Sequence, residues 1–309
     1  MLSCNSSESV EKTLLDESTL SMSFEDQMEF IENPSVASQL HGIRKNGIRK
    51  CKISKWERNL NNESLELQGD YIISYYNKLG CIDSIINPSY DVVKISHLYD
   101  EHNRLRKRSK EKAKWPLITR PDSSATIESI FHYDSLWQVQ KESIQGHEAM
   151  ESFDVNYSWS GKQLNTIDII NSAQDEHLTY QFEYKNGRLT KRHLISKKDD
   201  QFDKTNEFIY KNDKLIEITN TWILAHDLAE QDESYNSSNI NFSDLMNTKF
   251  EYDERDRLIR KQRVTGMWPG ESFWVTTYRY FENGLLREKE LNNSSAQGDI
   301  KIIYKYEYD

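Results

Sequence analysis

The chain has 309 residues and a formal net charge of −10, which argues against general nucleic-acid binding because phosphate contacts require a basic face. Only 36% of its residues are hydrophobic, yet 17 Tyr, 11 Phe and 7 Trp exclude the disordered class, which is poor in aromatic residues. The apolar surface therefore lies largely on amphipathic rings, which is typical of thin sheets wetted on one face.

The first 40 residues are acidic and rich in Ser, and residues 1–33 hold eight acids against Lys12 alone. Within them, SFEDQMEFIEN predicts a short helix that Ser23 caps and Pro34 stops. We interpret residues 1–40 as a tether and residues 41–309 as the folded domain.

The opening MLSCNSSES resembles the end of a bacterial lipoprotein signal, with Cys4 as the residue that receives the lipid. On this interpretation the protein is anchored in the bacterial cell envelope or exported, where Cys51 and Cys81 are able to pair. The alternative is a cytoplasmic protein with three reduced thiols, and the cysteine count does not separate the two. No stretch approaches the roughly 18 apolar residues of a membrane-spanning helix.

From residue 41 onward one pattern recurs, in which a run of alternating apolar residues ends in Tyr and is followed by a turn. Such alternation predicts β-strands. The first unit, residues 41–59, is a divergent hairpin expected to turn at Asn46 and Gly47. The later runs end at Tyr76, Tyr99, Tyr133, Tyr157, Tyr184, Tyr210, Tyr252, Tyr280 and Tyr308.

Two turn lengths follow these tyrosines, and both place an aliphatic residue opposite the Tyr, as in the pair of Tyr184 and Leu189. The two-residue loops favour positive φ at both positions, and the three-residue loops favour it at the third. The residues expected at positive φ are Asn186 and Gly187, Asn212 and Asp213, and then Gly80, Asn103, Asp256 and Gly284.

Two copies depart from this pattern. YSWSGKQL pairs Tyr157 with Gln163, although Gly161 fits the left-handed position. YDSLWQV would place Trp137 in that conformation, which is unfavourable for a bulky residue, so we expect a different turn there.

The pattern Tyr-Asp-x-x-Gly-Arg-Leu resembles the YD repeat of the Rhs and wall-associated protein family, over roughly residues 65–309. The dipeptide that names the repeat is present at Tyr99-Asp100, Tyr133-Asp134, Tyr252-Asp253 and Tyr308-Asp309. The resemblance implies hairpins that stack edge to edge into a curved, spiralling sheet. The chain is similar to a short member, without the self-cleaving core region and the toxin of the large shells.

Two insertions interrupt the repeats, near residues 110–126 and 220–247, and the second predicts a helix. Insertions in repeat proteins gather on one face, which is often the binding face. The candidates for ligand binding, by stacking of a ring on a sugar, are Trp115, Trp222, Trp268 and Trp274.

Motifs of catalytic sites are absent from the sequence, which has no phosphate-binding glycine loop, no Cys-x-x-Cys and no nucleophile elbow. HEAME, at 147–151, has Glu151 where a zinc-binding helix requires its second His. We therefore expect no catalytic residue, no cofactor and no metal ion.

Together these features predict an all-β fold of repeated hairpins in a curved antiparallel sheet or partial β-solenoid, after a helical or flexible N-terminal segment. The expected function is that of a non-enzymatic, cell-surface or exported binding and scaffold protein, whose ligand is a glycan or a protein. The alternative is a cytoplasmic immunity protein or chaperone associated with an Rhs-type toxin system. Because residues 300–309 end where the next turn would begin, we also expect an exposed edge strand at which the protein self-associates.

Overall fold

The computed structural model describes residues 34–58, 64–87, 92–112, 126–146, 152–196, 202–224, 247–267, 270–295 and 298–309. The helix predicted between Ser23 and Pro34, Cys4, and residues 113–125 and 225–246 of the two insertions lie outside them. The described elements are α3 Pro34–Asn46, β1 Lys50–Arg58, β2 Leu65–Tyr76, β3 Ile82–Ile86, β4 Val92–Tyr99, β5 Leu105–Lys112, β6 Thr126–Tyr133, β7 Val139–Gln145, β8 Phe153–Ser160, β9 Gln163–Asn171, β10 Glu176–Lys185, β11 Arg188–Ser196, β12 Phe202–Lys211, β13 Lys214–Leu224, β14 Thr248–Tyr252, β15 Leu258–Met267, β16 Gly270–Tyr280, β17 Leu286–Ser295 and β18 Gly298–Tyr308.

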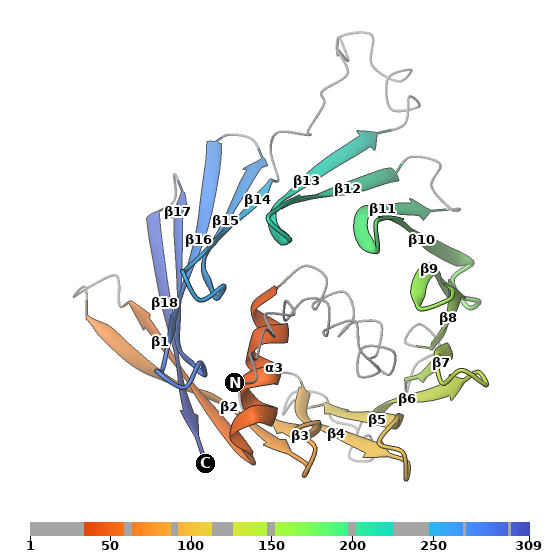
Figure 1. Ribbon diagram of the computed structural model, residues 1–309, viewed down its shortest axis with the longest axis horizontal. Helices are drawn as coiled ribbons and strands as arrows, with labels where there is room; N and C mark the ends of the chain where they lie inside the picture. The colour runs from red at the N-terminus through yellow and green to blue at the C-terminus, as the bar shows by residue number, and fades with distance from the viewer. Residues whose placement is uncertain are drawn as a thin grey trace, which may run out of the picture.

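The strands form one closed antiparallel barrel of 18 strands, in which each strand pairs with the next along the chain (Figure 1). The ring closes because β1 pairs with β18 on one side and with β2 on the other. The expected all-β class is present, but the curved open sheet or partial β-solenoid is wrong. The repeats do not spiral, since the last strand returns to the first.

The pairing of β1 with β18, which closes the ring, has the same geometry as the hairpins, although the two strands are far apart in the sequence. Tyr308 lies opposite Cys51, in the position where the other hairpins have an aliphatic residue. The Arg49 N–H donates to the Asp309 carbonyl at 2.9 Å, and the Asp309 N–H donates to the Lys50 carbonyl at 3.0 Å. The expectation that residues 300–309 form an exposed edge is therefore wrong, because β18 is paired on both sides.

The segment before β1 also differs from the expected hairpin at 41–59, because residues as far as Asn46 form α3. Pro34 is the first residue of this helix, which agrees with its missing N–H and fixed φ at a first helical position. Gly47, at φ 65°, ends α3, while the Ile48 N–H donates to the Ile43 carbonyl at 3.1 Å. This is the left-handed glycine termination that closes many helices.

All of the turn residues expected at positive φ have it, from 49° at Asn212 to 87° at Gly284. Trp137 has it too, at 65°, so the expected different turn is wrong. The guanidinium of Arg104 lies 3.8 Å from the centre of the Trp137 ring, and this contact offsets part of the strain.

The predicted cross-strand pairs are present at the start of each hairpin, directly after a one-residue shift of register. They are Tyr76 with Ile82, Tyr99 with Leu105, Tyr184 with Leu189, Tyr210 with Leu215, Tyr252 with Leu258 and Tyr280 with Leu286. Tyr133 lies opposite Val139 in the same way, which was not predicted. The pair of Tyr157 and Gln163 is wrong, because a two-residue turn moves Trp159 opposite Leu164. Trp159 thus takes the place of the Tyr in that hairpin.

Six of the rings at these positions also contact the hairpin before them through a hydrogen bond. The Tyr280 hydroxyl donates to the Leu258 carbonyl at 2.7 Å, and the indole N–H of Trp159 donates to the Val139 carbonyl at 2.8 Å. The same bond joins Tyr99 to Ile82, Tyr133 to Leu105, Tyr252 to Leu215 and Tyr308 to Leu286. A buried hydroxyl without a partner is costly, so this contact selects Tyr over Phe.

In three of the Tyr-Asp dipeptides, the Asp (Asp100, Asp134 or Asp253) organises the turn that follows. Asp100 Oδ1 accepts the N–H groups of His102 at 2.9 Å and Arg104 at 3.0 Å, and its Oδ2 accepts Arg104 Nε at 2.6 Å. Asp253 holds its own turn in the same way through Arg255 and Arg257. Although burial acts in the opposite direction, the bonds from Arg104 and His102 hold the pKa of Asp100 well below its usual value.

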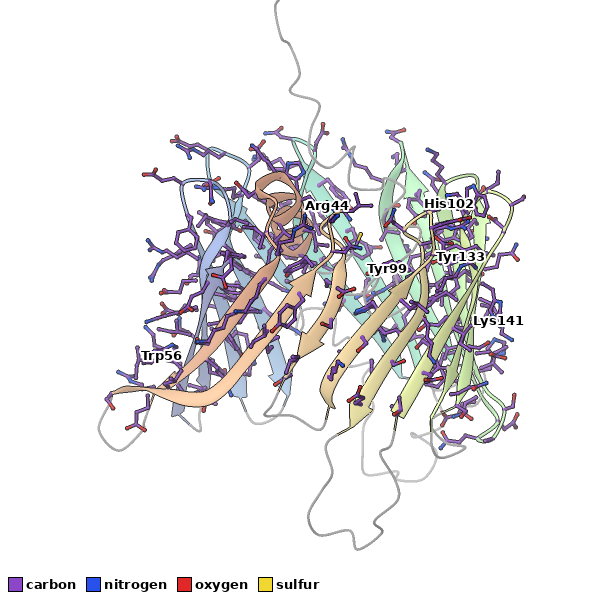
Figure 2. The ribbon with its side chains drawn as sticks, turned by 90° about the horizontal axis from the view of Figure 1, so that it is seen from below. Arg44, Trp56, Tyr99, His102, Tyr133 and Lys141 are labelled. Atoms are coloured by element: carbon purple, nitrogen blue, oxygen red, sulfur yellow. The ribbon has the colours of Figure 1, made fainter. Side chains whose placement is uncertain are left out.

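The tyrosine face of the sheet is the inner face of the barrel. Figure 1 places α3 inside the ring, and the Gln39 side chain of α3 is hydrogen-bonded to the Tyr308 hydroxyl. Gly42 meets Leu285, and Gly80 lies against Arg44, so α3 sits at the end of the barrel with these turns. Figure 2 shows Arg44 at the end that holds Tyr99, with Trp56 at the other.

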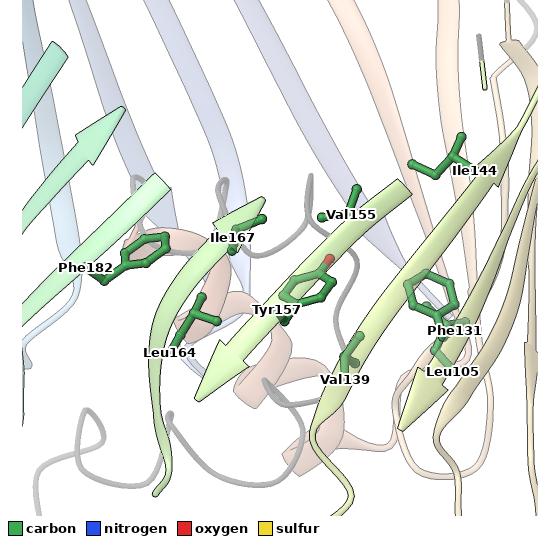
Figure 3. Packing of buried hydrophobic residues seen from close by; sticks show 9 residues of the cluster. All are labelled: Leu105, Phe131, Val139, Ile144, Val155, Tyr157, Leu164, Ile167 and Phe182. Carbon is green, nitrogen blue, oxygen red and sulfur yellow. The ribbon is translucent and has the colours of Figure 1, made fainter. Parts of the chain in front are cut away.

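Two apolar clusters line the inner wall and form the core. One spans β5 to β10 and is drawn in Figure 3: Leu105, Phe131, Val139, Ile144, Val155, Tyr157, Leu164, Ile167 and Phe182. The other is Phe208, Leu215, Ile218, Phe250, Leu258, Tyr278 and Leu286. The core is thus a lining on the inner surface of a single curved sheet.

Closure predicts a disulfide across the β1–β18 pair. Ser54 and Lys305 lie directly opposite each other, at a separation that a disulfide spans. We expect Ser54→Cys with Lys305→Cys to crosslink within one chain under mild oxidation, as mapped by mass spectrometry of the peptides. The control, Ser54→Cys with Lys301→Cys, is four residues out of register and stays reduced. Absence of the first crosslink would contradict the closed ring.

The turn geometry predicts a pH-dependent loss of stability in Asp100→Ala. This variant loses bonds to two backbone N–H groups and to Arg104, so we expect it to unfold with about 1–3 kcal/mol less free energy at neutral pH. Since the folded-state pKa is lowered, the deficit is full above the unfolded-state pKa of about 3.9 and shrinks as the pH falls below it. Urea denaturation at a series of pH values measures it, with the exposed Glu101→Ala as control. A deficit independent of pH would contradict the assignment.

Candidate functional site

Beyond the ring of tyrosines, the inner wall becomes basic. Alternation along a strand fixes which residues share the inner face, because successive side chains point to opposite sides. The cations in register with the tyrosine face are Lys55, Arg108, Lys110, Arg192, Lys204, Lys261, Arg263 and Lys289, and Lys55 is paired at 2.7 Å with Glu57 on the same face. Glu142 is an acid on the same face, and the buried Tyr157 hydroxyl donates to it at 3.1 Å. A chain of net charge −10 thus has a cationic interior wall.

Polar contacts hold part of this wall in place. Arg192 Nε and Nη2 both donate to Asn206 Oδ1, at 3.1 and 2.7 Å, and the Asn206 amide donates to Asn220 Oδ1. Arg192 also lies 5.7 Å from the centre of the Tyr180 ring. These buried contacts run across β11, β12 and β13, so the guanidinium group is fixed in orientation.

A pocket of about 220 Å³ lies on the inner face of β15, β16 and β17. Its lining comprises Lys261, Arg263, Trp274, Thr276, Tyr278, Lys289 and Leu291. Cross-strand register brings them together: Arg263 lies opposite Trp274, and Tyr278 lies opposite Lys289. The pocket therefore combines three cations, two aromatic rings and a hydroxyl on three adjacent strands.

This set of groups suits an anionic ligand that also presents a flat apolar surface. Lys and Arg donate charge-assisted hydrogen bonds to carboxylate or sulfate, and Arg does so in a bidentate geometry. Trp and Tyr rings add contact area at a small cost in conformational entropy. Among the described residues, no group of three His, Cys, Asp or Glu side chains is placed to bind a metal ion.

On the outer face, charges of opposite sign pair across neighbouring strands. The pairs include Lys107 with Glu128 at 2.6 Å, Lys141 with Asp154 at 2.9 Å, Lys191 with Glu207 at 3.3 Å, and Arg260 with Glu251 at 2.7 Å. In the described part of the chain, no helix has the length and apolar character needed to cross a membrane. The excess of cations over acids is therefore a property of the inner wall.

Of the four tryptophans expected to bind ligand, Trp274 lines the pocket. Trp222 lies in β13 opposite Lys204, whereas Trp115 and Trp268 fall outside the described residues. Cys51 and Cys81 are free thiols, and burial raises the pKa of Cys51 to about 12. Such a thiol is protonated at neutral pH and has no nucleophilic role.

Sequence reasoning missed the cations of the pocket. Lys261, Arg263 and Lys289 stand in strands as single basic residues among polar neighbours, with no motif around them. A signal was available, however: each occupies the inner-face register of a run whose Tyr had already been assigned. Tyr278 was passed over for Tyr280, two residues later on the same face.

Comparisons with known proteins concern the fold alone. No family model matches the chain, and no curated protein matches it. A porin-like protein from Bacteroides uniformis ATCC 8492 is similar in structure, with 9% identity, a TM-score of 0.44, and coverage of 85% of this chain and 98% of that one. A porin-like protein from Bacteroides vulgatus ATCC 8482 has 10% identity and a TM-score of 0.28, with coverage of 83% and 97%. TcdB2-TccC3 without its hypervariable C-terminal region has 13% identity and a TM-score of 0.37, with coverage of 80% of this chain and 13% of that one.

The expected β-solenoid of YD repeats is corrected to a closed barrel, because β18 pairs with β1. The resemblance to the Rhs and wall-associated family rested on the Tyr-Asp turns, and the structure contains these turns. The spiral that this resemblance implied is not formed.

Proposed function

We propose that the protein is a non-enzymatic binding protein that holds an acidic glycan against the inner wall of its barrel. The observation that supports the proposal is the pocket on β15, β16 and β17, where Lys261, Arg263 and Lys289 accompany the Trp274 ring. The pocket is small, so it would hold one or two sugar rings of a longer chain.

The chemistry of the ligand follows from the two kinds of group in the pocket. The cations favour carboxylate or sulfate substituents, whereas Trp274 favours the flat apolar face of a sugar ring. A wall that partly excludes water strengthens these charge contacts relative to an open surface.

The location that we propose is the bacterial cell envelope or the extracellular space, with a lipid on Cys4. Its support is the sequence MLSCNSSES. A protein exposed outside the cytoplasm would meet acidic glycans directly.

Reversing two charges of the pocket is the test of binding. In Lys261→Glu with Lys289→Glu, we expect affinity for a fluorescent heparin hexasaccharide to fall about tenfold or more, because each lost charged contact is worth roughly 1.5–3 kcal/mol. Fluorescence anisotropy measures it. The control is Lys185→Glu with Lys249→Glu, which makes the same charge change at two exposed positions.

Equal losses in the two double variants would mean that net charge alone determines binding, and would contradict the proposed site. The uncharged double variant Lys261→Gln with Lys289→Gln is included in case the charge reversal causes misfolding, which circular dichroism detects. Trp274→Ala separates ligands: it should weaken binding of the hexasaccharide more than that of a polyglutamate peptide. Equal weakening of both would assign the wall to an acidic polypeptide instead.

The location has its own test. The N-terminal peptide from the membrane fraction of the native host should have the mass of a diacyl or triacyl adduct on Cys4. An unmodified peptide found in the soluble fraction would contradict the lipid anchor.

A further inference from the structure

We propose that the acidic residues 1–33 of the chain bind the basic inner wall and compete there with the ligand. This inference rests on the binding site proposed above and adds its regulation. The segment would act as a built-in competitor, so that the ligand binds by displacing it.

Charge complementarity is the first support. Residues 1–33 contain Glu8, Glu11, Asp16, Glu17, Glu25, Asp26, Glu29 and Glu32 against Lys12. The wall has the opposite sign, with eight cations in register on the inner face of the described strands, where the acids include Glu57 and Glu142. Because the barrel encloses these cations on all sides, their fields add inside it.

The position of α3 is the second support. Its first residue, Pro34, follows directly on the acidic segment, and Figure 1 places the helix inside the ring. A Cβ added to Gly42 would lie 3.2 Å from Leu285 Cδ2, so α3 packs on the turn between β16 and β17. That hairpin carries Trp274, Tyr278 and Lys289 of the pocket. The segment is therefore attached to an anchor that touches the same hairpin as the site.

Attachment makes modest contacts effective. A segment tied to its binding surface by a short linker acts at an effective concentration of the order of millimolar. A free ligand must compete against that concentration, so its apparent affinity equals its intrinsic affinity multiplied by the fraction of molecules in which the site is uncovered. The competition is reciprocal, and a bound ligand excludes the segment by the same factor.

The composition of residues 24–32 matches the pocket beyond charge. FEDQMEFIE intersperses apolar side chains with four acids. The pocket intersperses Trp274, Tyr278 and Leu291 with its cations. Both kinds of contact that the glycan would make are thus available to the polypeptide.

The experiment neutralises these four acids in the full chain, by Glu25→Gln, Asp26→Asn, Glu29→Gln and Glu32→Gln together. Heparin hexasaccharide should then bind about tenfold more tightly, as measured by fluorescence anisotropy. The matched control makes the same charge change at four exposed acids, by Glu101→Gln, Glu183→Gln, Glu254→Gln and Glu282→Gln. We expect less than a twofold gain from this control.

A second measurement locates the segment in the unmodified chain. Carbodiimide joins carboxylates to lysines that touch them, and mass spectrometry should find peptides that link residues 25–32 to Lys261 or Lys289. Added hexasaccharide should suppress these crosslinks. Crosslinks confined to outer-face lysines, such as Lys107 and Lys141, would overturn the proposal.

The outcomes separate the two proposals. If the pocket variant loses binding but the tail variant binds no better than its control, the competition is wrong and the site stands. If the pocket variant binds as well as the wild type, the site itself is wrong. If tail and control variants gain equally, the gain reflects net charge, and the competition is again wrong.

Discussion

One contact recurs around the barrel and sets the spacing of its hairpins: the hydroxyl of a Tyr at the end of one strand donates to a backbone carbonyl in the hairpin before it. That carbonyl belongs to the aliphatic residue that lies opposite the preceding Tyr. Each hairpin is thus positioned by a donor from the next one. The contact requires a Tyr, an aliphatic partner and a turn that passes through the left-handed region, so one geometric condition accounts for three features of the repeat.

The same alternation that turns the tyrosines inward also determines the chemistry of the wall. Every second residue of a strand faces the interior, so Lys261 and Lys289 lie inside while Arg260 and Glu288 lie outside. On the outer face Arg260 meets Glu251, and Arg279 meets Glu288. Among the described strands, the inner face carries fewer acids than cations, and these acids include Glu57 and Glu142. A basic interior is therefore compatible with an acidic chain.

Turns were the part of the fold that the sequence predicted best, because a turn depends on three or four adjacent residues. Asn186, Gly187 and Asp256 all have the expected positive φ. Closure depends instead on the pairing of Cys51 with Tyr308, and no local pattern contains that information.

The candidate site was predicted only in part. Trp274 was identified by its residue type, since an aromatic ring near glycine and proline is conspicuous in a sequence. Its cationic neighbours come from two other strands and meet it only through cross-strand register. A lysine in a strand has no distinguishing feature until its face is known. The sequence therefore predicted the aromatic residue of the site, but not the charged residues that define its ligand.

The pairing of β1 with β18 has a consequence for how the chain folds. Lys50 and Asp309, which form an ion pair at 3.2 Å, are 259 positions apart, whereas the hairpins join neighbours. Most contacts in the barrel are therefore of low contact order and form early, but the closing contacts are of the highest order in the molecule. During synthesis, β1 pairs with β2 soon after β2 leaves the ribosome. The other edge of β1 then stays unpaired until β18 is made. The interval between those two events is the period in which this protein is most exposed to edge-to-edge aggregation.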